Sequence, residues 1–144
     1  MQSNRNNTLE KKIAARIARK KNDVMLRGDF ENLGGYDQVG RGLRNLVGEG
    51  KLVKIGYGLY ARAQPSPLSG QIIPTKNLPA LAIEALERLN VELAVSSSAR
   101  AYNEGFTTQV PTGRVIGVNG RVTRKIGYGG AYITYERISG STVS

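Results

Sequence analysis

Two arginines and two side-chain amides lie within one short stretch of the chain, Arg41 and Arg44 with Gln38 and Asn45. An arginine can donate two parallel hydrogen bonds to O6 and N7 of a guanine, and an amide can pair with an adenine or bond a phosphate. Each good bidentate pair discriminates against a wrong base by about 1–3 kcal/mol. These residue types predict recognition of nucleic acid rather than a chemical reaction.

A helix is needed to position these side chains, and the spacing of the apolar residues predicts one. Val39, Leu43, Leu46 and Val47 recur at intervals of four, seven and eight residues, which forms one stripe of a 3.6-residue period. The two arginines fall on the opposite side of the same helical wheel. We predict a helix over Tyr36–Glu49 that enters the major groove of duplex DNA.

Glycines surround and interrupt this helix. Gly34 and Gly35 precede it and Gly50 follows it, which fits a turn into the helix and a C-terminal stop. Three further glycines lie inside it: Gly40, Gly42 and Gly48. Each lowers helix propensity by about 1 kcal/mol relative to alanine. The helix therefore needs support from tertiary packing, and an exposed glycine would let a partner backbone approach closely.

Two local alternatives stay open for the same residues. Asp37 precedes Arg41 by four positions, and an ion pair at that helical spacing contributes only a few tenths of a kcal/mol. Such a pair would orient the arginine, so it is compatible with base recognition. The broader alternative is a surface helix whose charges are simply solvated.

After the helix the pattern changes to that of a β-hairpin. Leu52–Ile55 and Leu59–Arg62 flank a glycine-permitted turn with Tyr57 at its tip. Basic side chains here would meet phosphates or the minor groove, which positions a protein without specifying sequence; alternatively, Tyr57 packs beneath the hairpin. The full set of predicted DNA contacts is Tyr36, Gln38, Arg41, Arg44, Asn45, Lys51, Lys54, Tyr57 and Arg62.

The residues before this stretch predict three further secondary-structure elements. Asn7 can cap a first helix that runs to about Lys21, with residues 1–6 outside it. Val24–Leu26 is typical of a short strand, and Asp29–Leu33 of a brief second helix. Helix, strand, helix, helix, strand, strand is the order of a winged helix-turn-helix.

The charge balance supports a polyanion as partner. The 144 residues carry a net charge of +10 and a sequence pI near 10.2. Residues 1–65 hold 13 Lys/Arg and 6 Asp/Glu, whereas residues 66–144 hold 8 and 5. Most of the excess positive charge therefore belongs to the part of the chain that contains the helix and hairpin.

The absence of two residue types excludes several function classes. The chain has no cysteine and no histidine, so disulfides, thiolate chemistry, histidine-dependent triads and ordinary zinc sites are excluded. A carboxylate-only magnesium site would need clustered acids, but the eleven acids are scattered. We expect no enzyme activity, no metal and no cofactor. No apolar run is long enough to span a bilayer and the first residues are polar, so we expect a cytoplasmic protein without a membrane partner.

Composition divides the chain into three parts. Residues 1–64 are predicted to form the winged helix-turn-helix, and residues 65–79, rich in proline, a linker or strap. Residues 80–144 are predicted to form a small α+β domain with an antiparallel sheet, so the fold class is α+β. Pro79 suits the first turn of its helix, in which Ile83, Leu86 and Leu89 would face the core before a stop at Asn90.

The remaining C-terminal elements follow from alternation and turn residues. Asn119-Gly120 is predicted to close a two-residue hairpin. The other predicted elements are strands over Val91–Val95, Phe106–Val110, Arg114–Val118, Arg121–Tyr128 and Tyr132–Ile138, a helix over Ala99–Glu104 capped by Ser98, and a turn over Pro111–Gly113.

One pentapeptide occurs twice. Lys54–Gly58 and Lys125–Gly129 both have the sequence Lys-Ile-Gly-Tyr-Gly. Five residues are too few to indicate a duplicated fold. Either both places need a basic strand that enters a glycine-flanked aromatic turn, or both loops touch the same kind of ligand.

The sequence around the helix and hairpin resembles a known family. Tyr36–Val47 followed by Glu49–Ala61 is similar to the N-terminal domain of AbiEi-like antitoxins of bacterial abortive-infection, type IV toxin–antitoxin systems. The chain also resembles small prokaryotic proteins of unassigned function, in which a similar winged helix precedes a segment like Ala101–Arg114. This second resemblance covers residues 8 to 138.

The resemblance implies a transcriptional autorepressor that binds inverted repeats in double-stranded DNA of its own promoter. It also implies a neighbouring nucleotidyltransferase-type toxin as a protein partner. Half-site recognition by a monomer of this size is weak, so a homodimer on DNA is expected.

Two other functions use the same basic surfaces. A protein-interaction module would bind an acidic partner through Arg114, Arg121, Arg124, Lys125 and Arg137, although charges on strands also serve to protect sheet edges. Structured RNA could bind the same basic ribbons.

Overall fold

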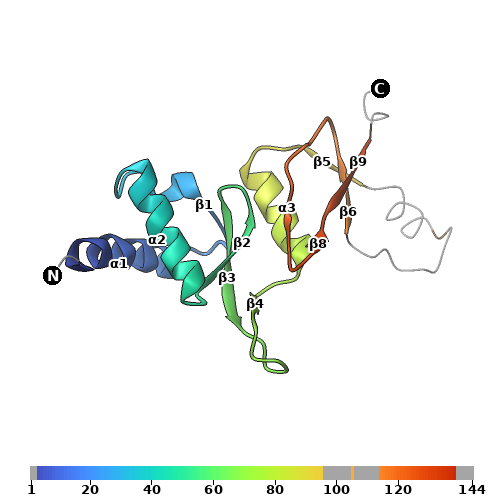
Figure 1. The fold of residues 1–144 in the computed structure, drawn as a ribbon. Helices are drawn as coiled ribbons and strands as arrows, with labels where there is room; N and C mark the ends of the chain where they lie inside the picture. Colours follow the sequence, from blue (N-terminus) through green and yellow to red (C-terminus); the bar gives the residue numbers. More distant parts are fainter. Residues whose placement is uncertain (1–2, 96–104, 106–113, 139–144) are drawn as a thin grey trace. The chain divides into compact units, whose positions relative to one another are not determined.

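A computed structural model of the protein describes residues 3–95, 105 and 114–138, with side chains from Thr8 onward. The fold is mixed α+β, and the described residues contain three α-helices (Figure 1). The chain divides into two compact units, Met1–Asn77 and Leu78–Ser144. Each unit has its own helical and strand elements.

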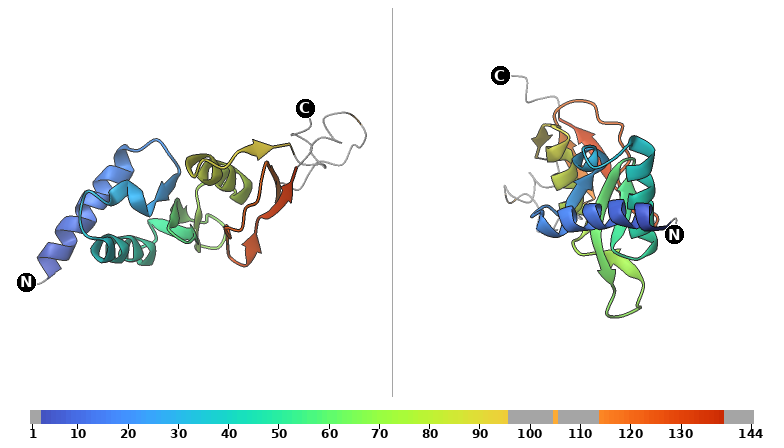
Figure 2. Two further views of the ribbon diagram at one scale, coloured as in Figure 1. Left: turned by 90° about the horizontal axis from the view of Figure 1, so that it is seen from above. Right: turned by 90° about the vertical axis from the view of Figure 1, so that its left-hand side faces the viewer.

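The first unit places two helices on one face of a small antiparallel sheet (Figures 1 and 2). Its elements in chain order are α1 (Ser3–Arg19), β1 (Val24–Leu26), the 3-10 helix η1 (Arg27–Phe30), α2 (Tyr36–Gly48), β2 (Leu52–Gly56), β3 (Leu59–Pro65) and β4 (Ile72–Pro74). Strand β3 is central, because β1 and β2 flank it and β4 pairs with its C-terminal part.

The core of this unit lies between the helices and the sheet. Side chains from every layer contribute to it: Ile13, Ile17, Met25, Phe30, Val39, Leu43, Leu46, Leu52 and Tyr60. The predicted apolar stripe of α2 is confirmed, since Val47 also packs against this cluster. Successive strand residues face opposite sides, and Leu59 and Ala61 on the side of β3 away from Tyr60 are buried as well.

Helix α1 begins earlier than predicted. It starts at Ser3, so Asn7 lies inside the helix and the predicted N-cap is wrong. Once a helix is nucleated each further residue adds a hydrogen bond, and none of the preceding residues is a breaker. The helix ends at Arg19, close to the predicted end, with the Lys20 amide bonded to the Arg16 carbonyl at 3.1 Å.

Helix α2 matches its predicted bounds to within one residue. Gly35 is the N-cap in extended conformation. At the other end Gly50 has a φ of +79°, and the Lys51 amide bonds the Leu46 carbonyl at 3.0 Å. A left-handed glycine with this bond forms a Schellman-type stop, which confirms the predicted role of Gly50.

The predicted short helix before α2 is a tighter turn. Instead of an α-helix over Asp29–Leu33, the chain forms η1 and then a hydrogen-bonded turn. The Asp29 carboxylate accepts the Leu26 amide at 2.9 Å, and such a local side-chain bond favours a turn over a continuing helix. Phe30 is nevertheless fully buried and Leu33 packs against the core, as predicted.

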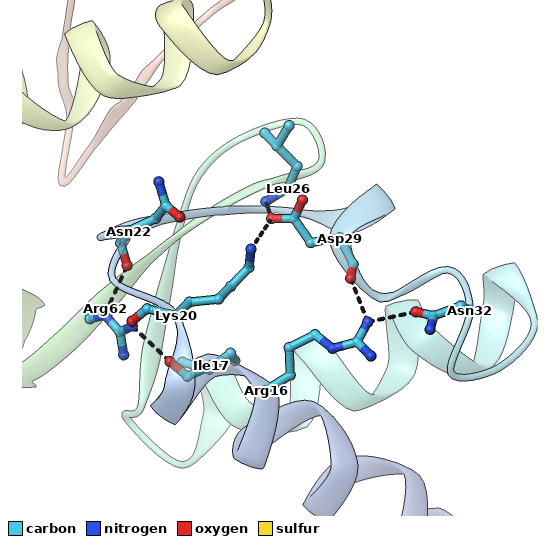
Figure 3. A network of polar contacts seen from close by, with 8 residues as sticks. All are labelled: Arg16, Ile17, Lys20, Asn22, Leu26, Asp29, Asn32 and Arg62. Carbon is cyan, nitrogen blue, oxygen red and sulfur yellow. Dashed lines mark hydrogen bonds and ion pairs between the residues drawn. The ribbon is translucent and has the colours of Figure 1, made fainter.

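A polar network fastens the C-terminal end of α1 to the elements around it (Figure 3). Arg16 donates to the Asp29 carbonyl at 2.9 Å and to the Asn32 side chain, and Lys20 pairs with the Asp29 carboxylate at 3.7 Å. Arg62 reaches the same helix from β3. These contacts fix α1 against η1 and the sheet.

Part of the predicted linker belongs to the sheet of the first unit. Strand β4 pairs with β3 in the register Ala63↔Pro74 to Pro65↔Ile72. Lys76 then pairs with Asp23 at 2.6 Å. The proline-rich composition correctly marks a break between secondary-structure elements. It does not show that the chain turns back and adds β4 as an edge strand. Edge strands tolerate proline.

In the second unit, residues 78–95 and 114–138 form one helix, a three-stranded sheet and a separate hairpin. Its elements are α3 (Leu78–Arg88), β5 (Leu93–Ala94), β6 (Val115–Val118), β7 (Gly127–Tyr128), β8 (Ala131–Tyr132) and β9 (Thr134–Arg137). Sheet order is β5–β6–β9, and β7 pairs with β8.

The pairing in this unit differs in part from the predicted antiparallel sheet. β5–β6 and β7–β8 are antiparallel, but β9 runs parallel to β6. Asn119-Gly120 forms a bend rather than a hairpin, and the Asn119 amide bonds the Glu92 carbonyl at 2.9 Å. The two-residue turn falls instead at Gly129-Gly130, both with positive φ. The predicted strand Arg121–Tyr128 is thereby reduced to its last two residues.

Helix α3 begins one residue before Pro79 and is followed by Asn90 at a φ of +62°, as the stop signal predicts. Its buried side is formed by Leu78, Leu81, Ala82, Ala85 and Leu86. Ile83 is 40% exposed, so its predicted core position is wrong. On the helical wheel the small Ala82 and Ala85 take that side instead.

The elements predicted at Ser98–Glu104, Phe106–Val110 and Pro111–Gly113 lie outside the described residues. Among the helices that the structure describes, none combines the length and apolar character needed to cross a bilayer.

Candidate nucleic-acid interface

The solvent-facing side of α2 carries the two arginines that the sequence analysis selected. Arg41 and Arg44 are both exposed. Within the described part of the chain, neither side chain forms a hydrogen bond or an ion pair, so the local pair between Asp37 and Arg41 is not formed. Both guanidinium groups are therefore available to a ligand on this side of the helix.

The two amides on the shoulder of α2 are in different situations. Gln38 is exposed and lines a small open depression with Leu9, Arg41 and Asn45. Asn45 instead donates from Nδ2 to the Glu10 carboxylate of α1 at 3.2 Å. Gln38 could contact a ligand directly, whereas Asn45 would first have to leave its partner.

A pair of carboxylates lies beside Asn45. The hydrogen bond between Glu10 and Glu49, and then burial, raise the pKa of Glu10 above its ordinary value, while the bond from Asn45 lowers it. Lys51 pairs with Glu49 at 3.5 Å, and both side chains are largely exposed. Such exposed pairs contribute about 0–1 kcal/mol, so Lys51 can exchange Glu49 for another anion.

The hairpin tip and the start of α2 meet through their tyrosines. Tyr36 and Tyr57 are 62% and 73% exposed, and their hydroxyl oxygens lie 3.2 Å apart. This hydrogen bond raises the pKa of Tyr36 above its ordinary value. The Lys54 ammonium lies 6.0 Å from the centre of the Tyr57 ring. The alternative that Tyr57 packs beneath the hairpin is therefore wrong, and helix and hairpin present one continuous aromatic and basic edge.

Arg27 holds this edge together, although no sequence pattern singled it out. Its guanidinium carbon lies 3.5 Å from the centre of the Tyr36 ring, and Nη2 donates to the Tyr36 carbonyl at 2.7 Å. Its backbone amide donates to the Gly58 carbonyl in the hairpin at 3.0 Å. Arg27 thus contacts both the first residue of α2 and the turn of the hairpin.

Two of the helix glycines allow other side chains of the protein to pack closely against α2. A Cβ added at Gly40 would lie 2.2 Å from Arg27 Nη2, and one at Gly42 would lie 2.8 Å from Ile13 Cδ1. Both glycines are buried, so neither offers an exposed surface to a partner backbone. Gly48 is exposed, with no atom within 4 Å of such a Cβ.

These contacts predict that two glycine-to-alanine changes in α2 differ in their effect on the free energy of unfolding. Gly48→Ala should stabilise the protein by up to about 1 kcal/mol through helix propensity. Gly40→Ala gains the same propensity but expels the Arg27 guanidinium from its place against Tyr36. We expect it to be neutral or destabilising in a urea titration.

A double-mutant cycle separates propensity from the clash. In an Arg27→Ala background, Gly40→Ala should stabilise as Gly48→Ala does, because the blocking group is gone. Equal stabilisation by Gly40→Ala in both backgrounds would contradict the placement of Arg27. Arg27 Nε is itself buried without a described hydrogen-bond partner, so the guanidinium is held there at some cost.

Arg62 is one of the predicted DNA contacts, but in the structure its side chain is bonded inside the protein. Its Nη2 donates to the Ile17 carbonyl at 2.7 Å and to that of Lys20, and its Nε donates to the Asn22 carbonyl at 3.0 Å. It also lies 3.9 Å from the Asp23 carboxylate. The donors that would bond phosphate satisfy one carbonyl in the last turn of α1 and two in the residues just after it. A positive charge at this end also complements the helix dipole.

The structure thus brings most of the predicted residues together. Tyr36, Gln38, Arg41 and Arg44 lie on the exposed side of α2, and the ribbon that follows adds Lys51, Lys54 and Tyr57. Among the residues that the structure describes there is no group of three or more carboxylates able to hold a metal ion. The arrangement can bind anions and planar groups.

Comparison with known proteins identifies a family whose function is unknown. The model of the "Family of unknown function (DUF6088)" matches residues 10–144. No curated protein and no solved structure matches the chain.

Proposed function

The chain belongs to the DUF6088 family of unknown function, and we propose that its first unit is a winged helix-turn-helix that binds duplex DNA in a sequence-specific manner. In this proposal α2 is the recognition helix, η1 takes the place of the preceding helix, and the β2–β3 hairpin is the wing. The element order and the sheet order β1–β3–β2 support it.

One observation carries the proposal. The exposed side of α2 presents two arginines without described partners, and the tip of the following basic hairpin is bonded to the first residue of the same helix through Tyr36 and Tyr57. A helix that enters a groove and a ribbon that follows the backbone must be presented on one surface. This contact fixes both to the same edge.

The residues divide into two kinds of contact. Arg41 and Arg44 recognise guanines, and Gln38 recognises adenine or a phosphate. Lys51, Lys54 and Tyr57 contact the phosphate backbone, which sets the register without specifying sequence. Arg27 acts through Tyr36 and the hairpin turn, so it is a positioning residue.

Salt dependence tests whether phosphates are the ligand. If the surface neutralises about five phosphates, log K should fall with log salt at a slope of about −4 to −5. We expect this slope in fluorescence-anisotropy titrations with a duplex from the region upstream of the gene. A slope near zero would rule out the DNA-binding function, and preferential competition by structured RNA of equal length would assign the surface to RNA.

The family resemblance noted from the sequence suggests the biological role. We propose an autorepressor that binds inverted repeats as a homodimer, with a neighbouring toxin as protein partner. A footprint on its own upstream region should contain two protected half-sites about one helical turn apart, or a multiple of it. Copurification with the product of the adjacent gene tests the toxin partner separately.

A further inference from the structure

The two copies of the pentapeptide share burial features but not secondary structure. Lys54–Gly56 lie in β2 and Tyr57-Gly58 form the turn, whereas Gly127-Tyr128 form β7 and the turn is Gly129-Gly130. In both copies the isoleucine is buried, Ile55 at 1% and Ile126 at 0% exposure, and the preceding lysine is exposed. Both copies lead into a two-strand antiparallel hairpin, β2–β3 and β7–β8. The repeat therefore encodes a buried anchor, an outward lysine and a glycine-bearing strand end.

Each lysine also lies near an exposed tyrosine of its own hairpin. Lys54 faces Tyr57 at 6.0 Å, and Lys125 lies 4.6 Å from the centre of the Tyr132 ring. The tyrosines differ in position, since Tyr57 is in the turn whereas Tyr132 is on the return strand and 47% exposed. In both hairpins the ammonium group lies near an aromatic ring, and with the residues that the structure describes it forms no ion pair.

Gly127 explains how the second hairpin achieves this arrangement. A Cβ at this position would lie 2.5 Å from Tyr132 Cδ1 and 2.1 Å from the Ala131 carbonyl oxygen. The tyrosine ring therefore lies across the glycine, in the space where any other residue would have a side chain. Lys125, two residues before β7, lies at the same ring, so its ammonium group is oriented on the surface before any ligand binds.

The segment that contains this hairpin is uniformly basic. Residues 121–132, here called the second basic hairpin, contain Arg121, Arg124 and Lys125 and no acidic residue. All three cations are exposed. The β2–β3 ribbon, residues 51–62, likewise contains three cations and no acid.

We propose that the second basic hairpin is an additional contact to the phosphate backbone of the same duplex DNA. This proposal rests on the proposed function of the first unit. Duplex DNA fits better than an acidic protein, because both hairpins carry an exposed lysine beside an aromatic ring and the first hairpin belongs to the unit that is proposed to bind DNA. The second basic hairpin therefore adds affinity and salt dependence without adding sequence specificity.

The test compares salt slopes of charge-neutralising variants in the full chain. Arg121→Gln/Lys125→Gln should make the slope of log K against log salt shallower by about 1.8, since each lost phosphate contact removes about 0.9. The ratio of affinities for the upstream site and a scrambled duplex should stay as in the parent. Arg137→Gln, an exposed cation in β9, is the control and should leave the slope unchanged.

The outcomes separate this proposal from the function of the first unit. A parent protein without salt-dependent duplex binding would overturn both. A parent that binds DNA, with an Arg121→Gln/Lys125→Gln variant of identical slope, would overturn only the second contact and leave that hairpin to an acidic protein partner. If the double variant folds poorly, the single changes Arg121→Gln and Lys125→Gln test the same contact. Each is expected to make the slope shallower by about 0.9.

Discussion

The Arg41→Ala/Arg44→Ala variant is expected to lose about 30-fold or more in affinity for the upstream site. Two bidentate guanine contacts at about 1–3 kcal/mol each give at least this factor. Binding to a scrambled duplex should fall much less, because phosphate contacts from the hairpin persist. The specific loss should therefore appear as a smaller ratio between the two duplexes in anisotropy titrations.

A second double variant controls for the loss of two positive charges. Arg19 and Lys21 are exposed near the end of α1 and are not among the predicted DNA contacts. Arg19→Ala/Lys21→Ala removes the same charge and should retain the parental ratio between specific and scrambled duplex. If both double variants keep that ratio, α2 is not the recognition helix.

Both arginine changes should leave stability almost unaffected. Arg41 and Arg44 are exposed and have no described side-chain partner, and surface substitutions of this kind usually stay within about 0.5 kcal/mol. A loss of binding can then be assigned to the interface rather than to unfolding.

Local patterns predicted the elements of the first unit well where one period dominated. The four apolar residues of α2 face the core, and Gly50 ends the helix as its position suggests. The hairpin followed from the change of period and the glycines around Tyr57. These features depend on spacing along a single element, which a sequence displays directly.

Two residues whose roles sequence analysis missed or misassigned, Arg27 and Arg62, act across elements. Arg27 has no local pattern, because its contacts are with Tyr36 and Gly58, nine and thirty-one positions away. Arg62 looked like a hairpin cation, yet it bonds carbonyls of α1 more than forty positions earlier. A clash such as that between a Cβ at Gly40 and Arg27 exists only once the chain is folded.

The second unit was harder to predict for a topological reason. A strong two-residue turn signal at Asn119-Gly120 competed with Gly129-Gly130, and the chain uses the latter. Because β9 is parallel to β6, the residues between them must return the chain to the end of the sheet at which β6 begins. Pairing between strands far apart in the chain produces no periodic pattern in the sequence. The repeated pentapeptide was visible, but the stacking of Lys125 on Tyr132 was not.

The contacts of Arg27 suggest why helix and hairpin would act as one binding surface. Its side chain lies on Tyr36, its backbone is bonded to the turn, and the two tyrosines join at their hydroxyl groups. Ordering these groups before binding lowers the entropy that association must overcome. A hairpin without this contact would still be basic but would sample many orientations.

Arg62→Ala is expected to have a large effect on stability and little effect on DNA binding by the folded protein. The change removes three hydrogen bonds from a charged donor to carbonyls of Ile17, Lys20 and Asn22. Bonds to charged groups contribute about 1.5–3 kcal/mol each but are not additive, so we expect a loss of about 2–4 kcal/mol. For a unit of this size that corresponds to roughly 10 °C or more in Tm.

Arg62→Lys sharpens the interpretation of that result. A lysine keeps the charge near the end of α1 but cannot reach several carbonyls with a planar fork of donors. We therefore expect a Tm between those of the parent and Arg62→Ala, measured by circular dichroism. At a temperature where all three proteins are folded, their affinities for the upstream duplex should agree within about threefold, less than the smallest single-base effect. An unchanged Tm together with weakened binding would instead return Arg62 to the DNA contacts, and its bonds to α1 would then be incidental.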